Sequence, residues 1–255
     1  MILVIDIGNT NIVFGIFKDD QFQLEFRVET SKQKLATDYQ MILRSFMLEN
    51  NLKASQFKKI ILSSVVPALT STIQETCEHL FGLSVIRPSA DNYTYLPLKI
   101  RNPRQIGTDL VANALAAWQA TKSTSIVIDF GTALTFTVVD AHGEIKGVNI
   151  APGLKTAMKA LSGNTAQLPE IPLEFPKSVI GTDTVTAIQS GLMVGYTGLV
   201  KHMISEIRKE LNQSCKVIAT GGLSSILENL HTEFDQVDRH LTLKGLFYMS
   251  KYIEK

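Results

Sequence analysis

An apolar strand that ends in Asp-x-Gly occurs twice in the chain, once at the N-terminus and once near the middle. The first copy spans Ile2–Phe17 and has Asp6 before its turn, and the second spans Ser125–Asp140 and has Asp129 before its turn. A second apolar run follows each turn, so each copy predicts a β-hairpin with a polar tip. A third strand and then helices follow both hairpins. We therefore expect two copies of one α/β unit.

The repeat predicts where two domains lie. We expect an N-terminal domain over residues 1–118 and a C-terminal domain over residues 119–255, each a mixed sheet that opens with an antiparallel meander and is flanked by helices. In the second domain the apolar periodicity predicts a long helix over 184–211, a short one over 223–229 and a last one over 242–253. The long helix carries small residues at spacings that allow close helix contact, including across a dimer: Gly191, Gly195 and Gly198.

Composition argues against several classes of partner. The 255 residues are 45% hydrophobic and 19% charged, with a formal net charge of +1. This balance is ordinary for a globular protein and gives no reason to expect nucleic acid or a membrane as partner. The two cysteines, Cys77 and Cys215, belong to no disulfide or metal-ligand pattern. Because Asp6 interrupts the only apolar run near the N-terminus, we expect no signal peptide and a cytoplasmic location.

The first turn has the residues of a phosphate site. Gly8 lets a ligand approach the backbone closely, and Asn9 and Asn11 tolerate left-handed backbone conformations. The turn amides and the Thr10 hydroxyl can donate hydrogen bonds to phosphate oxygens. Asp6, at the end of the first strand, is placed to bind a phosphate-bound Mg²⁺, directly or through water. A purely structural hairpin is the alternative at this point.

A third acidic residue, Asp109, follows a loop-like stretch over residues 87–105. Gly107 and Thr108 precede it, and together they open a predicted helix over 109–121. At a helix N-terminus the dipole is expected to hold the carboxylate ionised. An ionised carboxylate can orient a hydroxyl group and accept its proton late in phosphoryl transfer. Capping of the helix is the alternative role.

Three motifs together resemble a known superfamily. Asp6-Ile-Gly-Asn-Thr, Asp129-Phe-Gly-Thr and Thr220-Gly-Gly are similar, in this order, to the first phosphate, second phosphate and adenosine motifs of the acetate and sugar kinase, heat-shock chaperone and actin superfamily. The resemblance implies an α/β fold of two duplicated actin-like (ribonuclease H-like) domains that bind ATP with Mg²⁺. It further implies that four residues of the second domain contact ATP: Gly131, Thr132, Gly221 and Gly222.

Within this superfamily the chain resembles type III pantothenate kinase, through Asn102-Pro103-Arg104-x-x-Gly107-Thr108-Asp109 and Gly181-Thr-Asp-Thr184. The resemblance implies a cytoplasmic, homodimeric transferase that phosphorylates pantothenate with ATP to 4'-phosphopantothenate, the first step of coenzyme A biosynthesis. It assigns Asp109 as the proton acceptor, Asp129 as the ligand of K⁺ or NH₄⁺, Thr132 to ATP and Thr184 to pantothenate. The stretch from Gly107 to Leu110 is implied to bind the substrate.

Two positions depart from the family pattern. Leu110 stands where the family has Arg, and Ile100 stands where it has Tyr. An Arg at the first position would pair with the pantothenate carboxylate, which Leu cannot do. Arg101 or Arg104 could supply the charge from another angle, and the aromatic ring could come from a tyrosine nearby, Tyr93 or Tyr95. Two alternatives therefore stay open: a regulatory relative of the accessory-factor type, and a kinase for another small hydroxyl substrate.

Overall fold

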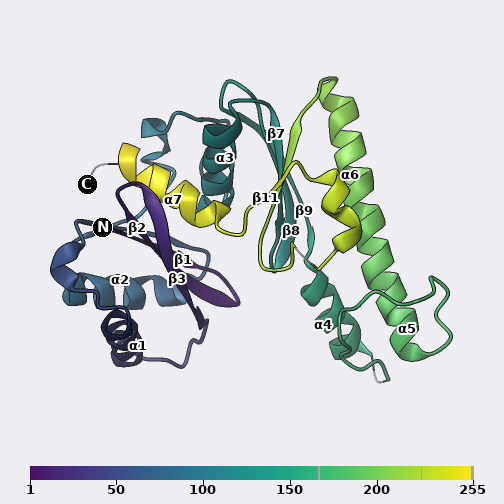
Figure 1. Ribbon diagram of the computed structural model, residues 1–255, viewed down its shortest axis with the longest axis horizontal. Coiled ribbons are helices and arrows are strands. Elements are labelled where there is room, and N and C mark those ends of the chain that lie inside the picture. The colour runs from purple at the N-terminus through teal and green to yellow at the C-terminus, as the bar shows by residue number, and fades with distance from the viewer. Residues whose placement is uncertain (166, 225, 254–255) are drawn as a thin grey trace. The chain divides into compact units, whose positions relative to one another are not determined.

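The computed structural model describes residues 1–165, 167–224 and 226–253, and it forms two compact units (Figure 1). Unit 1 comprises Met1–Ala116 together with the chain from Leu241 onward, and unit 2 comprises Ala117–His240. The break at residue 116 lies close to the expected boundary at 118. The last helix differs from the expectation, because it belongs to unit 1 rather than to the C-terminal domain.

The sheet of unit 1 has the strand order β3-β2-β1-β4-β5. Strands β1 and β2 pair antiparallel, as do β2 and β3, so the predicted meander is present. Strand β4 pairs parallel to β1 and β5 pairs parallel to β4, which makes the sheet mixed. The strands of this sheet are β1 (Ile2–Ile7), β2 (Asn11–Lys18), β3 (Gln21–Glu29), β4 (Lys59–Ser64) and β5 (Val85–Ile86). The short strand β6 (Lys99–Ile100) falls within the residues of unit 1 but is not part of this sheet.

Helices cover both faces of this sheet. Figure 1 shows α1 (Ala36–Glu49) and α2 (Pro67–Phe81) on one face and α7 (Leu241–Tyr252) on the other. Alternate residues of the central strands, such as Leu3 and Ile5 of β1, enter the core on the α1 and α2 side. The remaining elements of unit 1 are α3 (Thr108–Thr121), which continues into unit 2, and the short 3₁₀ helices η1 (Ala54–Gln56) and η2 (Tyr93–Tyr95).

Specific contacts attach α7 to unit 1. The Phe247 ring stacks on Phe17 of β2 with 4.3 Å between centroids, and the Lys251 ammonium donates to Asp20 at 2.6 Å. At Gly245 the helix meets α3 so closely that an added Cβ would lie 2.0 Å from the Ala112 carbonyl oxygen. The apolar face of α7 is therefore buried on the sheet of the first unit, which explains why sequence order alone assigned it wrongly.

Unit 2 repeats the topology of unit 1. Its strands β9, β8, β7, β10 and β11 follow one another in the order that β3, β2, β1, β4 and β5 have in unit 1. The pairings also repeat: β7, β8 and β9 are antiparallel, whereas β10 is parallel to β7 and β11 to β10. Their bounds are β7 (Ser125–Phe130), β8 (Ala133–Val139), β9 (Glu144–Pro152), β10 (Lys216–Thr220) and β11 (Gln236–Val237).

The predicted long helix of unit 2 is one helical rod with a π-helical turn in it. Its parts are α5 (Thr184–Gln189), the π-helical turn η3 (Ser190–Val194) and α6 (Gly195–Leu211), and α4 (Leu154–Asn164) precedes it. The predicted helix over 223–229 is wrong. Ile226 donates to the Leu223 carbonyl at 3.0 Å, so turns of i to i+3 type lead into the 3₁₀ helix η4 (Glu228–Glu233). None of the described helices has the length and apolar character needed to cross a membrane.

Candidate functional site

The first Asp-x-Gly turn is held in shape by backbone bonds. The Gly8 amide donates to the Asn11 carbonyl at 2.9 Å, which closes the turn between β1 and β2. Thr30 at the end of β3 supports it from the side, since its hydroxyl donates to the Gly8 carbonyl at 2.7 Å and its amide donates to the Thr10 carbonyl at 3.0 Å. Asn9 and Thr10 are exposed at the tip. The predicted phosphate turn is thus a fixed and accessible structure.

A hydroxyl group lies in register with Asp6. Asp6 of β1 is the register partner of Ser63 on the parallel strand β4, so both side chains point to the same face of the sheet. This is the α7 face, because Leu3, Ile5 and Ile7 point to the other side. The Ser63 side chain is 1% exposed, and its hydroxyl has no hydrogen-bond partner among the described residues. Such an orphaned group is unusual in a protein interior.

The second turn is anchored by the start of α4. The Gly131 amide donates to the Ala133 carbonyl at 3.1 Å. The Thr132 carbonyl accepts two bonds, from the Gly153 amide at 2.9 Å and from the Thr156 hydroxyl at 2.6 Å. An added Cβ on Gly153 would lie 2.2 Å from the Gly131 carbonyl oxygen, so only glycine fits there. The turn after Asp129 is therefore held in shape by hydrogen bonds, as the first turn is.

The structure brings the second phosphate motif and the adenosine motif together. Asp129 is in register with Thr220 on the parallel strand β10 and with Thr135 on β8. Gly221 has φ +91°, and an added Cβ on it would lie 2.5 Å from an Asp129 carboxylate oxygen. The hydroxyls of Thr135 and Thr220 are buried and have no hydrogen-bond partner among the described residues. Asp129 thus lies among two orphaned hydroxyls and a close glycine.

Asp109 occupies the first turn of α3. Its carboxylate accepts the amide of Leu110 at 2.9 Å, and the Val111 amide donates to the Gly107 carbonyl at 3.1 Å to begin the helix. An added Cβ on Gly107 would lie 2.3 Å from the same carboxylate, so glycine leaves room for it. Burial raises the pKa of Asp109 above its ordinary value of 3.8, despite the bonds from the backbone amides that lower it. The backbone amides of the helix N-terminus favour the ionised carboxylate, as expected, but desolvation has the larger effect on the pKa of Asp109.

The candidate partners of an acidic substrate are exposed. Arg104 is 85% exposed in its side chain, and its guanidinium lies 3.9 Å from the exposed Asp91 carboxylate, too long for a strong ion pair. Arg101 is also exposed, whereas Leu110 is buried. Both arginines precede the N-terminus of α3 in the chain.

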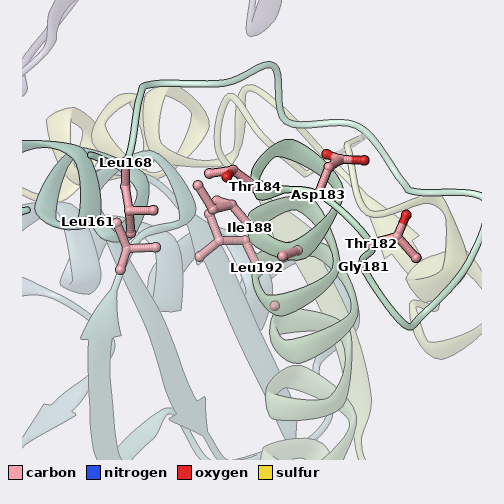
Figure 2. Close-up of a pocket in the computed structure, with 10 residues that line it drawn as sticks. Leu161, Leu168, Gly181, Thr182, Asp183, Thr184, Ile188 and Leu192 are labelled. Atoms are coloured by element: carbon pink, nitrogen blue, oxygen red, sulfur yellow. The ribbon is translucent and has the colours of Figure 1, made fainter.

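Thr184 lies at a pocket of about 690 Å³ within unit 2. Figure 2 shows Leu161 and Leu168 on one side of it and Ile188 and Leu192 of the long helix on the other, with Thr184 beside Ile188 at the start of α5. The remaining lining is Ala187, Gly191 and Gly181–Asp183. Among the described residues that line it, Asp183 alone carries a charge, so this pocket suits an apolar or hydroxyl-bearing group better than an anion.

Sequence reasoning did not find the three orphaned hydroxyls. Ser63 and Thr220 each stand near the carboxyl end of an apolar parallel strand, which is where ligands bind in open α/β sheets. A register argument could have found both, because each belongs to the strand that follows the duplicated meander. Thr135 requires the hairpin register, which the sequence does not specify to one residue.

The comparisons with known proteins identify the family. Residues 2–206 match the family described as "Type III pantothenate kinase". Proteins of that name from Anaeromyxobacter dehalogenans (strain 2CP-C) and Anaeromyxobacter sp. (strain K) are each 37% identical over 246 residues, which are 96% of this chain and 97% of theirs. The chain belongs to the type III pantothenate kinase family. Leu110 and Ile100 are therefore departures within the family and do not argue against membership.

Solved structures share the fold. The activator of the 2-hydroxyisocaproyl-CoA dehydratase from Clostridium difficile, with bound ADPNP, is 10% identical, covers 99% of this chain and 98% of its own, and has a TM-score of 0.54. The inorganic polyphosphate/ATP-glucomannokinase from Arthrobacter sp. strain KM is 17% identical with 98% of both chains covered and a TM-score of 0.50. At these identities the likeness concerns the fold alone, which is the duplicated actin-like α/β fold.

Proposed function

We propose that the protein transfers the γ-phosphoryl group of ATP to the primary hydroxyl of pantothenate, giving 4'-phosphopantothenate, the first step of coenzyme A biosynthesis. The observation that carries this proposal is the Asp109 carboxylate at the N-terminus of α3, in the motif through which the chain resembles its family. Its raised pKa makes this carboxylate a better proton acceptor than an ordinary aspartate. A weak base is enough for phosphoryl transfer, because positioning of the reactants and neutralisation of charge contribute most of the catalysis.

The decisive experiment is ADP release coupled to a dehydrogenase, with pantothenate, ATP, Mg²⁺ and K⁺. We expect turnover that requires pantothenate and gives one ADP per phosphopantothenate. Turnover only with another alcohol would favour a kinase for a different small hydroxyl substrate. No turnover with any acceptor, together with retained ATP binding, would favour the regulatory alternative.

Residue roles follow from the site as parts of this proposal. The turn of Gly8–Asn11 and the turn at Gly131 and Thr132 bind ATP phosphates through their amides and hydroxyls. Gly221 and Gly222 contact the adenosine part of ATP, as the adenosine motif implies. Gly107–Leu110 position the acceptor beside Asp109, and Thr184 is a further residue that binds the acceptor, as the resemblance to the family implies. Arg101 or Arg104 pairs with the pantothenate carboxylate and takes the role of the Arg that the family has at the position of Leu110.

Asp6 and Asp129 are proposed to hold the cations. No cluster of three or more His, Cys, Asp or Glu side chains that could bind a metal occurs in the described part of the chain. At Asp6, one carboxylate with nearby neutral oxygens fits a Mg²⁺ that is held through water and is also bound by the ATP phosphates. At Asp129, a donor set of the same kind fits K⁺ or NH₄⁺. The orphaned hydroxyls of Ser63, Thr135 and Thr220 are oxygen donors beside these carboxylates, so the residues present fit both cations.

Thr220→Val tests the monovalent cation site. We expect K⁺ to raise the Tm of the wild type relative to choline at equal ionic strength, because a ligand of the folded state stabilises it. Thr220→Val should lose most of this rise. Without K⁺ the free energy of unfolding of Thr220→Val should equal that of the wild type or exceed it by about 1–3 kcal/mol, because a buried unpartnered hydroxyl is removed. Thr137→Val on β8, in register with Val127 rather than with Asp129, should keep the K⁺ effect. An undiminished K⁺ effect in Thr220→Val would contradict the assignment.

The protein is further proposed to be a homodimer that associates through α6 and the preceding π-helical turn. Gly191, Gly195 and Gly198 are exposed, and an added Cβ at each would meet no atom within 4 Å. Helices can approach closely over such a face. A reducing cytoplasmic location is proposed as well, because Cys77 and Cys215 are both free thiols.

Gly198→Glu tests the dimer face. Within one chain the new side chain has open space and a better helix propensity than glycine, so folding should be unimpaired. Across a close helix pair it would be buried and unpaired, so sedimentation should show a monomer where the wild type is a dimer. Gly163→Glu on α4, also exposed with no atom within 4 Å of an added Cβ, should leave the dimer intact. A dimer that survives Gly198→Glu would place the interface elsewhere.

A further inference from the structure

A buried tyrosine, Tyr93, contacts the first residue of α3. The Tyr93 side chain is 4% exposed, and its hydroxyl lies 2.9 Å from the Thr108 hydroxyl. Thr108 directly precedes Asp109 in the chain. Burial raises the pKa of Tyr93, and the charge of Asp109 raises it further, so the phenol stays neutral and can donate to Thr108.

The loop that carries Tyr93 is built to hold it in place. The Asn92 side chain accepts the Ser89 amide at 2.8 Å and donates to the Arg87 carbonyl at 3.0 Å. The Tyr93 amide donates to the Ser89 carbonyl at 3.2 Å, and the Leu96 amide donates back to the Tyr93 carbonyl at 3.0 Å. Tyr93 is therefore fixed by bonds on both sides along the chain. Tyr95, in the same 3₁₀ turn, is 64% exposed and has no such position.

We propose that Tyr93 is a positioning residue for the phosphoryl acceptor site, acting through its hydrogen bond to Thr108. The inference rests on the proposed function and extends it to a residue that the family motifs do not include. A tyrosine hydroxyl buried to this degree needs a partner, and the Thr108 hydroxyl provides one. The bond ties the loop of η2 to the first turn of α3. It thereby fixes the rotamer of Thr108 and the backbone that presents the Asp109 carboxylate.

This role differs from filling space. Phe at position 93 would keep the packing of the ring and would remove only the bond to Thr108. When a reacting group loses the contact that holds it in position, the reaction slows, because misplacement by about 1 Å can cost 100-fold in rate. The first turn of α3 is the place where such a loss would be felt.

Steady-state kinetics of five variants test the proposal. Tyr93→Phe and Thr108→Val should each lower kcat by about 10- to 100-fold and leave the KM for ATP unchanged. The double variant should be no worse than Thr108→Val alone, because Tyr93→Phe removes only a bond that Thr108→Val has already removed. Thr108→Ser keeps a hydroxyl and should retain most activity. Tyr39→Phe is the matched control, since it removes another buried tyrosine bond, to the Ser31 carbonyl at 3.0 Å, and should behave as the wild type.

A second measurement needs no substrate and so separates this inference from the proposed function. In the free protein the ¹³C-detected titration of the Asp109 carboxyl should move to lower pH in Tyr93→Phe, because a loosened first turn admits water to the carboxylate. It should not move in Tyr39→Phe. Wild-type-like kinetics in Tyr93→Phe, additive losses in the double variant, or an unmoved titration would each overturn the positioning role. Absence of turnover in the wild type, with the titration moved, would overturn only the choice of acceptor.

Discussion

Asp109→Asn is expected to lower kcat for pantothenate phosphorylation by about 100- to 10,000-fold, the range for removal of a general base. The KM for ATP should change little, because Asp109 acts on the acceptor. Asn has nearly the same shape and can still accept the Leu110 amide, so the loss reports proton transfer rather than geometry. Steady-state rates at saturating ATP measure it. Retained turnover would remove Asp109 from this role.

The same variant should be more stable than the wild type at neutral pH, and the sign follows from the direction of the pKa shift. Burial raises the pKa of Asp109 above the ordinary 3.8, so below that value the carboxyl is protonated in both states and costs nothing. As the pH rises, the unfolded chain loses the proton first and the wild type loses stability until the pH passes the raised pKa of the folded state. Asn carries no charge and escapes this loss.

We expect the gain in Asp109→Asn to grow as the pH rises above about 4, to level off once the pH passes the raised pKa of the folded state, and to reach about 0.5–2 kcal/mol, the range of single stabilising changes. Thermal unfolding of both proteins across this range measures it. Asp19→Asn is the control, because Asp19 is exposed in a turn at φ 48°, a conformation that Asn also adopts. A gain that does not depend on pH would show that desolvation of the carboxylate is not its cause.

The duplicated pattern was enough to predict most of the fold. Hydrophobic alternation located the hairpins at Asp6 and Asp129, and the spatial order of the five core strands matches in the two units. What the pattern could not predict is where an amphipathic helix packs. Helix α7 follows unit 2 in the chain but stacks Phe247 on Phe17 of unit 1, and nothing in its own sequence distinguishes the two sheets.

The site was predictable in its motifs and not in its environment. Glycines and acids at strand ends predicted the turns, because the turns require those residue types. The burial of Asp109, the bond from Tyr93 to Thr108 and the hydroxyls beside Asp129 all depend on packing between segments distant in the chain. The error over residues 223–229 has a local cause. Leu227 and Leu230 are buried with a spacing of three, and 3₁₀ turns satisfy that spacing as well as a helix does.

Gly221→Ala is expected to have the largest effect on stability among the changes considered. Its backbone has φ +91°, which a residue with a Cβ rarely adopts, and the new Cβ would lie 2.7 Å from backbone atoms of Phe130 and 2.5 Å from an Asp129 oxygen. The neighbouring strand is the centre of the sheet and cannot move aside. Strain and overlap together should cost about 2–5 kcal/mol, which corresponds to a fall in Tm of roughly 5–15 °C.

Gly222→Ala separates this effect from a general intolerance of the motif. No atom lies within 4 Å of an added Cβ on Gly222, so its free energy of unfolding should stay within about 0.5 kcal/mol of the wild type. The overlap in Gly221→Ala involves the Asp129 carboxylate, so K⁺ should no longer stabilise the folded fraction of this variant. Gly222→Ala should still be stabilised by K⁺. Denaturant unfolding with and without K⁺ measures both quantities. Equal stability of the two variants would mean that Gly221 does not pack against Asp129, and the cation site proposed there would lose its structural basis.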